Sequence, residues 1–539
     1  MDTAGCVRCH RDIVEAYART GMGRSFSRAA EAQGKLYHAA SDRSYEIAGG
    51  KMMRYQLGPG GRRVNEMEKS IDYALGSGNH AKTFLHRNPD GALVELPVSW
   101  YSEKGGLFAM SPGYDRPDHE DFRRQVAEDC MFCHNAYPRK DNALPEGIDC
   151  QRCHGPASDH KALINPAKLS RERQMDVCQQ CHLEPTSSPP PSVVRRPERR
   201  PYSYRPGEPL TDYAVYFEAG IGDRFEVAHQ AYRLRKSACF LGSRMTCTTC
   251  HDPHRAQPVA HFIEVCKSCH ASTHRASENC LDCHMWKRRS DDAPHVVMTD
   301  HYIQRRKPAS FTSGEAHVRV PYFPDENPGP QYYRNGMKAS KAGDHAAAIR
   351  WFRQAIQSGD NPVAARRELA ASMILSGDLS GGAEESAKLP DDTVAMTNLG
   401  NAYLQLGRVD DAVRVLEKAP EEPRANNLLG LAELKAGDAR AAESAFRRAI
   451  NLQPDLAEAN YNLGNLLAAR SDYAEAAWYF GKAVAANPRD AESRHSYGLV
   501  LALTHDYRNA RIQLEEALRL APGSAEIRSA LEDLRGSRR

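Results

Sequence analysis

The residues with the clearest chemical potential in this chain are its cysteines and histidines, because they recur together in one fixed frame. Cys-x-x-Cys-His occurs seven times and uses 14 of the 15 cysteines, leaving only Cys239 outside the frames. We number the frames I to VII in chain order. Their thiol and imidazole residues are Cys6, Cys9 and His10; Cys130, Cys133 and His134; Cys150, Cys153 and His154; Cys178, Cys181 and His182; Cys247, Cys250 and His251; Cys266, Cys269 and His270; and Cys280, Cys283 and His284.

This frame has the spacing required for covalent attachment of c-type haem. Two thiols one helical turn apart can each form a thioether with a porphyrin vinyl group, and the adjacent histidine can bind the iron. Zinc ribbons pair two Cys-x-x-Cys units and need no histidine after each one. A disulfide framework belongs to short secreted chains and would not keep a histidine at the next position. The sequence therefore predicts seven covalent haems, with the seven frame histidines as proximal iron ligands.

A six-coordinate haem iron needs a second axial ligand, and the chain offers more candidates than irons. Of its 22 histidines, 15 lie outside the frames, and any one of them could be merely structural. Seven are favoured by their place near a frame or in a turn: His80, His119, His160, His229, His254, His295 and His301. His38, His86, His261 and His274 are reserves, and we expect Cys239 to be a buried structural thiol.

Met22 is an alternative ligand for the first haem. It lies twelve residues after His10 between two glycines, and a thioether ligand would raise the reduction potential of that iron. The competing interpretation is a packing residue, because methionine readily fills gaps. If Met22 does bind iron, one of the seven histidines is redundant.

Length and charge limit the remaining possibilities. A chain of 539 residues predicts two or three domains, and 72 Lys and Arg against 69 Asp and Glu argue against a nucleic-acid binder. Some basic residues should pair with haem propionates. No run approaches the roughly 20 apolar residues of a membrane span. Because bacteria and archaea attach c-type haem outside the cytoplasmic membrane, we expect an exported, periplasmic or extracellular protein whose signal peptide is not in the printed sequence.

The chain divides by composition. Residues 1–310 hold every cysteine and predict a mainly α, haem-packed domain with few short strands, limited to hairpins near 35–55 and 92–110. A Pro/Arg-rich stretch, 184–210, should be an extended surface loop, and 311–330 a Pro-rich linker.

Residues 331–539 repeat with a fixed period. Gly430, Gly464 and Gly498 lie 34 residues apart, and each is followed at fixed offsets by alanines, an aromatic or leucine, and a proline. This is the pattern of tetratricopeptide repeats, which stack helix pairs into an α-solenoid. We expect five to six repeats.

Several stretches resemble the multihaem cytochromes of the hydroxylamine oxidoreductase and pentahaem nitrite reductase superfamily, in particular those joined to tetratricopeptide repeats. The stretches are GSGNHAKTF, EDCMFCHNAYP, GIDCQRCHGPASDH, MTCTTCHDPH, and NCLDCHM followed by HVVMTDHYIQR. The resemblance covers most of residues 1–305 and implies distal ligation by His160 and His254. The sequence lacks the Cys-x-x-Cys-Lys of the nitrite reductases, and no cross-linking tyrosine can be assigned. The resemblance therefore implies electron transfer more strongly than catalysis.

Closely spaced frames such as VI and VII force neighbouring porphyrins together, which favours a chain of electron-transfer sites. We expect an electron carrier without catalytic residues, with redox proteins as partners. The repeats would then dock a partner or assemble copies of the chain, including into an extracellular electron-conducting filament. Two alternatives remain: a reductase of a small nitrogen or sulfur compound at a five-coordinate haem, and an adaptor in which the repeats carry the function.

Overall fold

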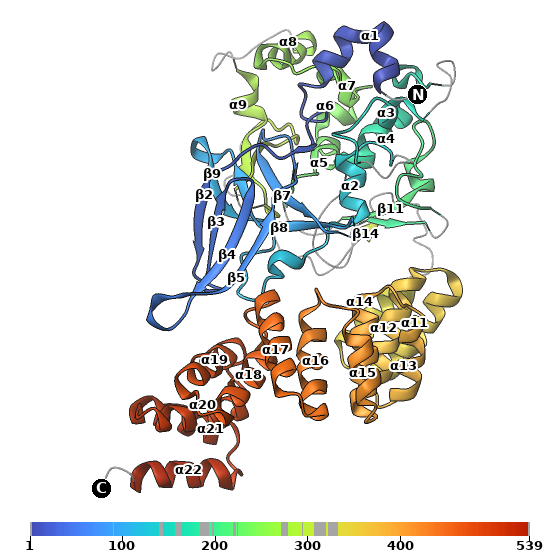
Figure 1. Ribbon diagram of the computed structural model, residues 1–539. Helices are drawn as coiled ribbons and strands as arrows, with labels where there is room; N and C mark the ends of the chain where they lie inside the picture. Colours follow the sequence, from blue (N-terminus) through green and yellow to red (C-terminus); the bar gives the residue numbers. More distant parts are fainter. Residues whose placement is uncertain are drawn as a thin grey trace.

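The computed structural model describes residues 3–89, 91–138, 144–156, 163–183, 193–196, 199–218, 223, 225–270, 279–293, 295–306, 320–321 and 332–536. The described part is mainly helical. Its first part contains strands, together with short helices that carry the seven frames. Its last part is a curved stack of helix pairs (Figure 1). No described helix is both long and apolar enough to span a bilayer.

Two antiparallel sheets follow the first frame. The first sheet is a meander in the order β2-β3-β4-β5, and the second has the order β1-β6-β7-β8-β9. Their strands are β1 (Phe26–Arg28), β2 (Gly34–His38), β3 (Arg43–Ala48), β4 (Lys51–Leu57), β5 (Arg63–Ser70), β6 (Tyr73–Leu75), β7 (Ala81–Arg87), β8 (Leu93–Tyr101) and β9 (Leu107–Met110). Alternate residues such as Tyr45, Ile47 and Val98 point into a shared core.

The expectation of few short strands in the first 310 residues is thus wrong for residues 26–110. This stretch contains no Cys-x-x-Cys-His frame, so its core has to come from its own side chains. Two facing sheets supply that core through alternate apolar residues. The patterns near 35–55 and 92–110 marked real strands but only part of both sheets.

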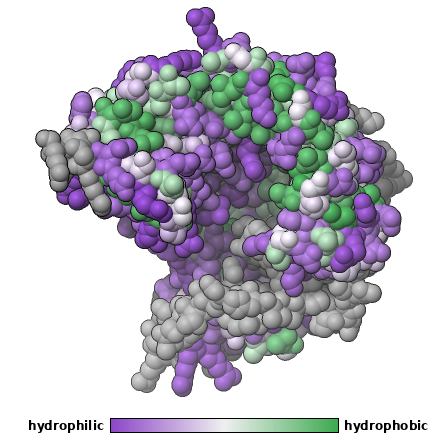
Figure 2. Space-filling view, turned by 90° about the horizontal axis from the view of Figure 1, so that it is seen from below, coloured by the Kyte–Doolittle hydropathy of each residue, from purple (hydrophilic) through white to green (hydrophobic). Residues whose placement is uncertain are grey.

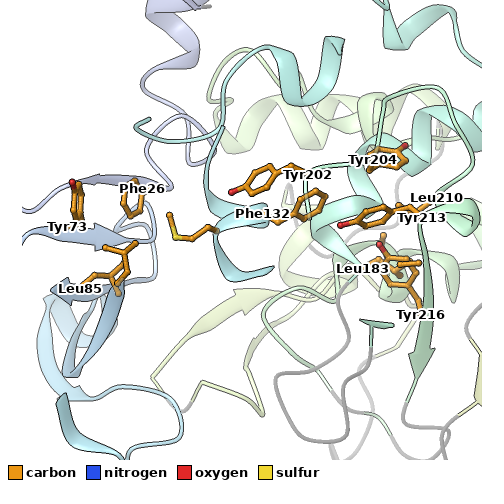
Figure 3. Close-up of a cluster of buried hydrophobic side chains, with 14 residues drawn as sticks. Phe26, Tyr73, Leu85, Phe132, Leu183, Tyr202, Tyr204, Leu210, Tyr213 and Tyr216 are labelled. Atoms are coloured by element: carbon orange, nitrogen blue, oxygen red, sulfur yellow. The ribbon is translucent and has the colours of Figure 1, made fainter. Parts of the chain in front are cut away.

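The frames lie on short helices beyond these sheets. The helices that carry them are α1 (Thr3–Tyr17), α2 (Glu128–His134), α3 (Gln151–His154), α4 (Arg171–His182), α7 (Cys247–Cys250), α8 (Val259–Cys269) and α9 (Cys280–His284). Two further helices, α5 (Gln230–Arg235) and α6 (Ala238–Leu241), come before frame V. An aromatic cluster joins the sheets to the helices (Figure 3). Phe26 of β1 and Tyr73 of β6 lie on the sheet side, and Phe132 of α2 lies near Tyr202, Tyr204 and Tyr213.

Small ladders fix the ends of this domain. β12 (Lys287–Arg289) pairs with β13 (Val297–Thr299) just after frame VII. β10 (Val193–Arg195) pairs with β11 (Ala214–Glu218), so part of the predicted loop 184–210 is a strand, while 184–192 and 197–198 lie outside the described residues. Within the predicted linker 311–330 only residues 320–321 are described, as β14 (Val320–Pro321) paired with β11.

The C-terminal helices pack as successive antiparallel pairs. They are α10 (Tyr332–Lys341), α11 (His345–Ser358), α12 (Pro362–Leu375), α13 (Leu379–Ala387), α14 (Thr393–Gln405), α15 (Val409–Leu416), α16 (Pro423–Ala436), α17 (Ala439–Leu452), α18 (Ala457–Ala469), α19 (Tyr473–Ala486), α20 (Ala491–Leu503), α21 (Tyr507–Leu520) and α22 (Ala525–Gly536). At Gly430 a Cβ would stand 2.5 Å from the Phe446 ring of the paired helix. Glycine there allows the two helices to approach this closely.

The helix stack rests on the first sheet through buried arginines. α17 contacts β5 and the short helix η3 (Asp121–Arg123) (Figure 1). Arg54 Nε lies 2.9 Å from the Asp121 carboxylate, and the same guanidinium donates to the Asn451 carbonyl at the end of α17. Arg43 Nη2 pairs with Asp455 at 2.5 Å, and Lys482 pairs with Asp42 at 2.5 Å. The contact between the two regions therefore includes two fully buried arginines, Arg43 and Arg54.

Candidate functional site

The seven frames adopt closely related local structures. In α2, α3, α4 and α9 the frame histidine is the last helical residue, and in α7 and α8 it follows directly as the cap. In α1 the backbone leaves the helix at His10, with φ −124° and ψ 36°. A helix places residues i, i+3 and i+4 on one face. Both thiols and the imidazole of a frame therefore project from the same side of a helix end.

All 15 cysteines lie among the described residues, and none of them forms a disulfide bond there. Among the described residues, no group of three or more His, Cys, Asp or Glu side chains is arranged to hold a metal ion.

Frame III meets a histidine from the loop after frame V. The rings of His154 and His254 have centroids 6.0 Å apart and planes 16° apart. The Asp252 carboxylate accepts from the His254 backbone N–H at 2.9 Å and lies 3.4 Å from His254 Nδ1. This short turn holds the His254 imidazole opposite the frame III histidine.

Frame V meets a histidine from the segment after frame VII. The rings of His251 and His301 have centroids 6.1 Å apart and planes 27° apart. The Ser237 hydroxyl donates to the His301 carbonyl at 3.3 Å and accepts from the Ile303 N–H at 2.8 Å. The position of His301 is therefore fixed from α6.

These separations match two imidazoles that bind one metal ion from opposite sides. A metal–imidazole nitrogen bond is about 2 Å long and the ring centroid lies about 1 Å farther out, so the two centroids are about 6 Å apart. Both pairs join a frame histidine to a residue predicted as a distal ligand.

Hydrogen bonds at Nδ1 set which ring nitrogen is available. His154 Nδ1 lies 2.8 Å from the Ile164 carbonyl, and His284 Nδ1 lies 2.6 Å from the Gln304 carbonyl. His301 Nδ1 lies 3.1 Å from the Thr299 carbonyl. A carbonyl only accepts, so Nδ1 carries the hydrogen and Nε2 keeps its lone pair. This is the tautomer that binds metal through Nε2.

Burial keeps several of these imidazoles neutral. Burial and, to a smaller extent, the neighbouring His251 lower the pKa of His301 to about 4. Burial likewise lowers the pKa of His134 to about 4, and its Nδ1 is buried without a hydrogen-bond partner among the described residues. A neutral imidazole is the form that binds a metal ion.

The helices of frames V to VII have apolar side chains but little core of their own. No residue of α7, α8 or α9 is buried, although α8 contains Val259, Phe262 and Ile263. Val259 is 55% exposed, and Leu241 of α6 is 71% exposed. Exposed apolar surface of this kind usually marks a binding site. A flat apolar group the size of a porphyrin would cover such side chains.

The frames lie close to one another, although not in sequence order. Burial and the adjacent Cys6 thiol of frame I raise the pKa of Cys150 in frame III to about 11. Contact with Cys247 of frame V and burial raise the pKa of Cys178 in frame IV. Burial and the Cys280 thiol of frame VII raise the pKa of Cys266 in frame VI to about 11.

Other predicted ligands have different surroundings. His119 is buried within hydrogen-bond distance of Arg43 and Tyr45, and its Nδ1 accepts from the Asp121 N–H. It therefore lies in the charged cluster beneath the helix stack. Among the described residues, His119 makes no ring contact or hydrogen bond with a frame histidine.

Three more predicted ligands lie around β12 and β13 or near α5. His295 Nδ1 is 2.9 Å from the Glu103 carboxylate, and exposed His80 accepts at its carbonyl from the Ser102 N–H. His229 is buried beside Glu226 and the Tyr232 ring. The structure does not pair these three with a frame histidine in any ring contact of the described residues.

The remaining predictions are less defined. His160 lies outside the described residues. The Met22 carbonyl accepts from the Ile148 N–H just ahead of frame III, and its side chain is half-buried. Cys239, expected to be buried, is half-buried and lies near Cys250 and Cys266.

Four charged residues that support the site were not singled out from the sequence. Arg233 and Arg288 both pair with the fully buried Asp300, at 2.6 and 3.1 Å, and both pair with Asp223. Asp300 directly precedes His301, so this quartet anchors the β12–β13 ladder that presents the histidine. The only signal in the sequence was the acidic residue beside a candidate ligand.

Comparison with known proteins identifies the C-terminal part. A sequence profile of the tetratricopeptide repeat matches residues 397–457, 427–482 and 461–525. Among curated proteins, none matches the chain.

Solved structures similar to part of this chain share about a fifth of its residues there. They include the APC/C hetero-tetramer Cut9-Hcn1 (19% identity, 38% of this chain and 42% of that chain, TM-score 0.34). They also include PilF of Pseudomonas aeruginosa (21%, 38% and 96%, TM-score 0.34) and MamA (22%, 35% and 94%, TM-score 0.23). The chain thus spans less than half of the Cut9-Hcn1 chain it matches. Because the sequence profile matches this region three times, the C-terminal part of this protein consists of tetratricopeptide repeats.

Proposed function

We propose that this protein is a multihaem c-type cytochrome that carries electrons between protein partners. The observation that carries the proposal is the placement of His254 and His301 opposite the histidines of frames III and V, at the separation of two axial ligands on one metal ion. In each case the partner imidazole comes from a segment distant in sequence. Folding therefore completes a two-histidine site that a single frame cannot provide.

The residues of each frame have separate roles in this proposal. The two thiols attach the porphyrin covalently, and the frame histidine binds its iron. Bound haem supplies a one-electron couple at its iron. His154 and His301 keep Nε2 available because their Nδ1 atoms donate to backbone carbonyls. At frames III and V, imidazoles on both sides would leave a bound haem iron without an open position, which favours electron transfer over catalysis there.

The surroundings of the frames also fit haem. The unburied apolar side chains of α8, together with Leu241, offer surface that a porphyrin would cover. Frames from distant parts of the sequence lie side by side, which suits transfer between neighbouring sites. Because c-type attachment takes place outside the bacterial or archaeal cytoplasm, the proposal includes export to the periplasm or beyond.

The tetratricopeptide repeats supply the contacts with other proteins. Repeats of this kind mediate protein–protein interaction. Large apolar side chains are exposed on the first helices of several pairs: Leu375, Leu406, Leu434 and Leu503. The face seen from below is hollowed and has apolar patches along its rim (Figure 2). We assign partner docking, or assembly of copies, to this part of the chain.

Spectroscopy of the purified protein tests the proposal. We expect only low-spin ferric signals, with no spectral change after adding nitrite, hydroxylamine or cyanide. A high-spin signal that shifts with one of these ligands would show an open iron, and would favour the reductase alternative. Absence of any haem spectrum from exported protein would reject both.

A further inference from the structure

Residues 247–254, from Cys247 to His254, connect frames from both halves of the first domain. We call them the junction segment. Toward the earlier frames, His254 faces His154 with 6.0 Å between ring centroids. The Cys247 thiol lies 3.7 Å from the Met175 sulfur, on the helix that carries frame IV. The segment therefore touches both frame III and the frame IV helix.

The same segment contacts the later frames. His261 Nε2 of α8 lies 3.2 Å from the Cys250 carbonyl oxygen, and α8 ends in frame VI. His251 faces His301 with 6.1 Å between ring centroids. Three residues beyond His301, the Gln304 carbonyl accepts from His284 of frame VII at 2.6 Å. Frame VI is therefore linked to the junction segment through α8, and frame VII is linked to it through residues 301–304.

The turn between the two imidazoles is built to keep them apart. Asp252 accepts from the His254 N–H, and its own N–H donates to Gln257 Oε1 at 2.8 Å. Pro253 restricts the backbone between them. His251 and His254, three residues apart, thus face different partners, His301 and His154.

On each side of the junction segment, frames are also joined directly. Gln180 Nε2 of frame IV donates to the Arg152 carbonyl of frame III at 3.2 Å, and Arg152 Nη2 donates to the Phe132 carbonyl of frame II at 2.8 Å. The Ile148 N–H donates to the Met22 carbonyl, which ties the loop after frame I to frame III. On the other side, α8 packs against α9.

We propose that the junction segment is the crossing point for electrons between frames I–IV and frames VI–VII. The inference rests on the proposed function, because it requires haem at the frames. Each step moves one electron between neighbouring irons, one of which is oxidised as the other is reduced. The consequence is specific: loss of frame V should divide the molecule into two redox groups, whereas loss of frame II should not.

The test uses two matched variants of the full-length protein, each lacking one of the seven frames. Cys247→Ala/Cys250→Ala removes frame V, and Cys130→Ala/Cys133→Ala removes frame II. Intact mass must first show six haems in each variant and seven in the parent. A parent without seven haems would reject the proposed function itself, which is a different result from failure of the crossing point.

Electrons are then delivered to α8. A photosensitiser is coupled to a thiol introduced by Glu264→Cys, an exposed position of α8 outside frame VI, in a Cys239→Ser background. A sacrificial amine supplies the electrons under illumination. We expect all six haems of the frame II variant to be reduced in one phase. In the frame V variant we expect a fast phase of two haems, followed by a slow phase of four.

A single-phase reduction in the frame V variant would overturn the proposal. Because that variant can fail to fold, His301→Met provides a second test that retains every thiol. A thioether in place of this imidazole should raise the potential of one haem and trap the electron at frame V. We then expect slow onward reduction of the other haems. An unchanged set of potentials, or onward reduction at the parental rate, would contradict the assignment.

Discussion

At the scale of single residues, the account depends on which imidazoles face one another. The frame histidines were fully apparent from the sequence, because the Cys-x-x-Cys-His spacing is local. Their partners were not, since pairing of His154 with His254 joins positions 100 residues apart. Seven candidates fitted by position, and the resemblance favoured His160 and His254 among them. Only the fold shows that His254 faces frame III and His301 faces frame V.

Replacing His254 tests the pairing with frame III. We expect His254→Ala to leave the haem content unchanged and to convert one haem to a high-spin form that binds added imidazole. The matched control is His261→Ala, because His261 Nε2 already lies 2.8 Å from Gln257 Nε2 and 3.2 Å from the Cys250 carbonyl. Electron paramagnetic resonance distinguishes the two. A low-spin spectrum in His254→Ala would exclude this residue as the ligand.

Glu95 gives the first domain a defined pH dependence. Burial raises the pKa of this carboxyl from 4.5 to about 7, although Arg124 Nε, 3.4 Å away, lowers it. At pH values between 4.5 and about 7, the Glu95 carboxyl keeps its proton in the folded protein and releases it in the unfolded chain. The contribution of Glu95 to stability therefore falls as the pH rises through this range. Glu95→Gln removes that dependence.

The measurement is the free energy of unfolding of both proteins at two pH values. We expect the variant to gain about 1–3 kcal/mol over the parent between about pH 4 and about pH 8. An equal difference at both pH values would mean that folding leaves the pKa of Glu95 unchanged.

At the scale of elements, the short helices of the frames could be predicted, but the two sheets could be predicted only in part. A frame fixes its own helical turn, whereas strands of residues 26–110 depend on partners such as Tyr45, Phe84 and Val98 across two sheets. The ladder of β12 and β13 was also missed, because each strand has only three residues. Its stability comes from the buried quartet around Asp300, which no local pattern reveals.

Asp300 should be the critical residue of this ladder. Asp300→Asn removes the carboxylate charge shared by Arg233 and Arg288 and leaves two buried cations with less compensation. We expect a loss of about 3–5 kcal/mol in the free energy of unfolding. Asp223→Asn is the control, because the Asp223 side chain is 31% exposed and should cost less. Equal losses, measured by chemical denaturation, would contradict a special role for Asp300.

At the scale of the whole molecule, the repeats were predicted from their 34-residue period, but their contact with the first sheet was not. The contact uses Arg43, Arg54 and Lys482, whose partners lie hundreds of residues away in sequence. Charge composition alone cannot show that two of these side chains are fully buried. The arrangement fixes the helix stack relative to the frame-bearing domain.

Arg54 should hold the two regions together. Arg54→Met leaves the buried Asp121 carboxylate with Arg43 alone, at 3.9 Å, and removes the donor to the Asn451 carbonyl. We expect a loss of about 3 kcal/mol and separate unfolding of the two regions. Arg63→Met, on the same sheet but 43% exposed, should cost less than about 1 kcal/mol. Calorimetry that shows one unchanged transition in Arg54→Met would refute the docking role.

The most direct measurement is mass spectrometry of the exported, mature protein, intact and after proteolysis. The account predicts an added mass of seven haem groups, each found on a peptide that contains one Cys-x-x-Cys-His frame, with Cys239 unmodified. Frame peptides recovered with free thiols, or with zinc as their only bound group, would contradict it.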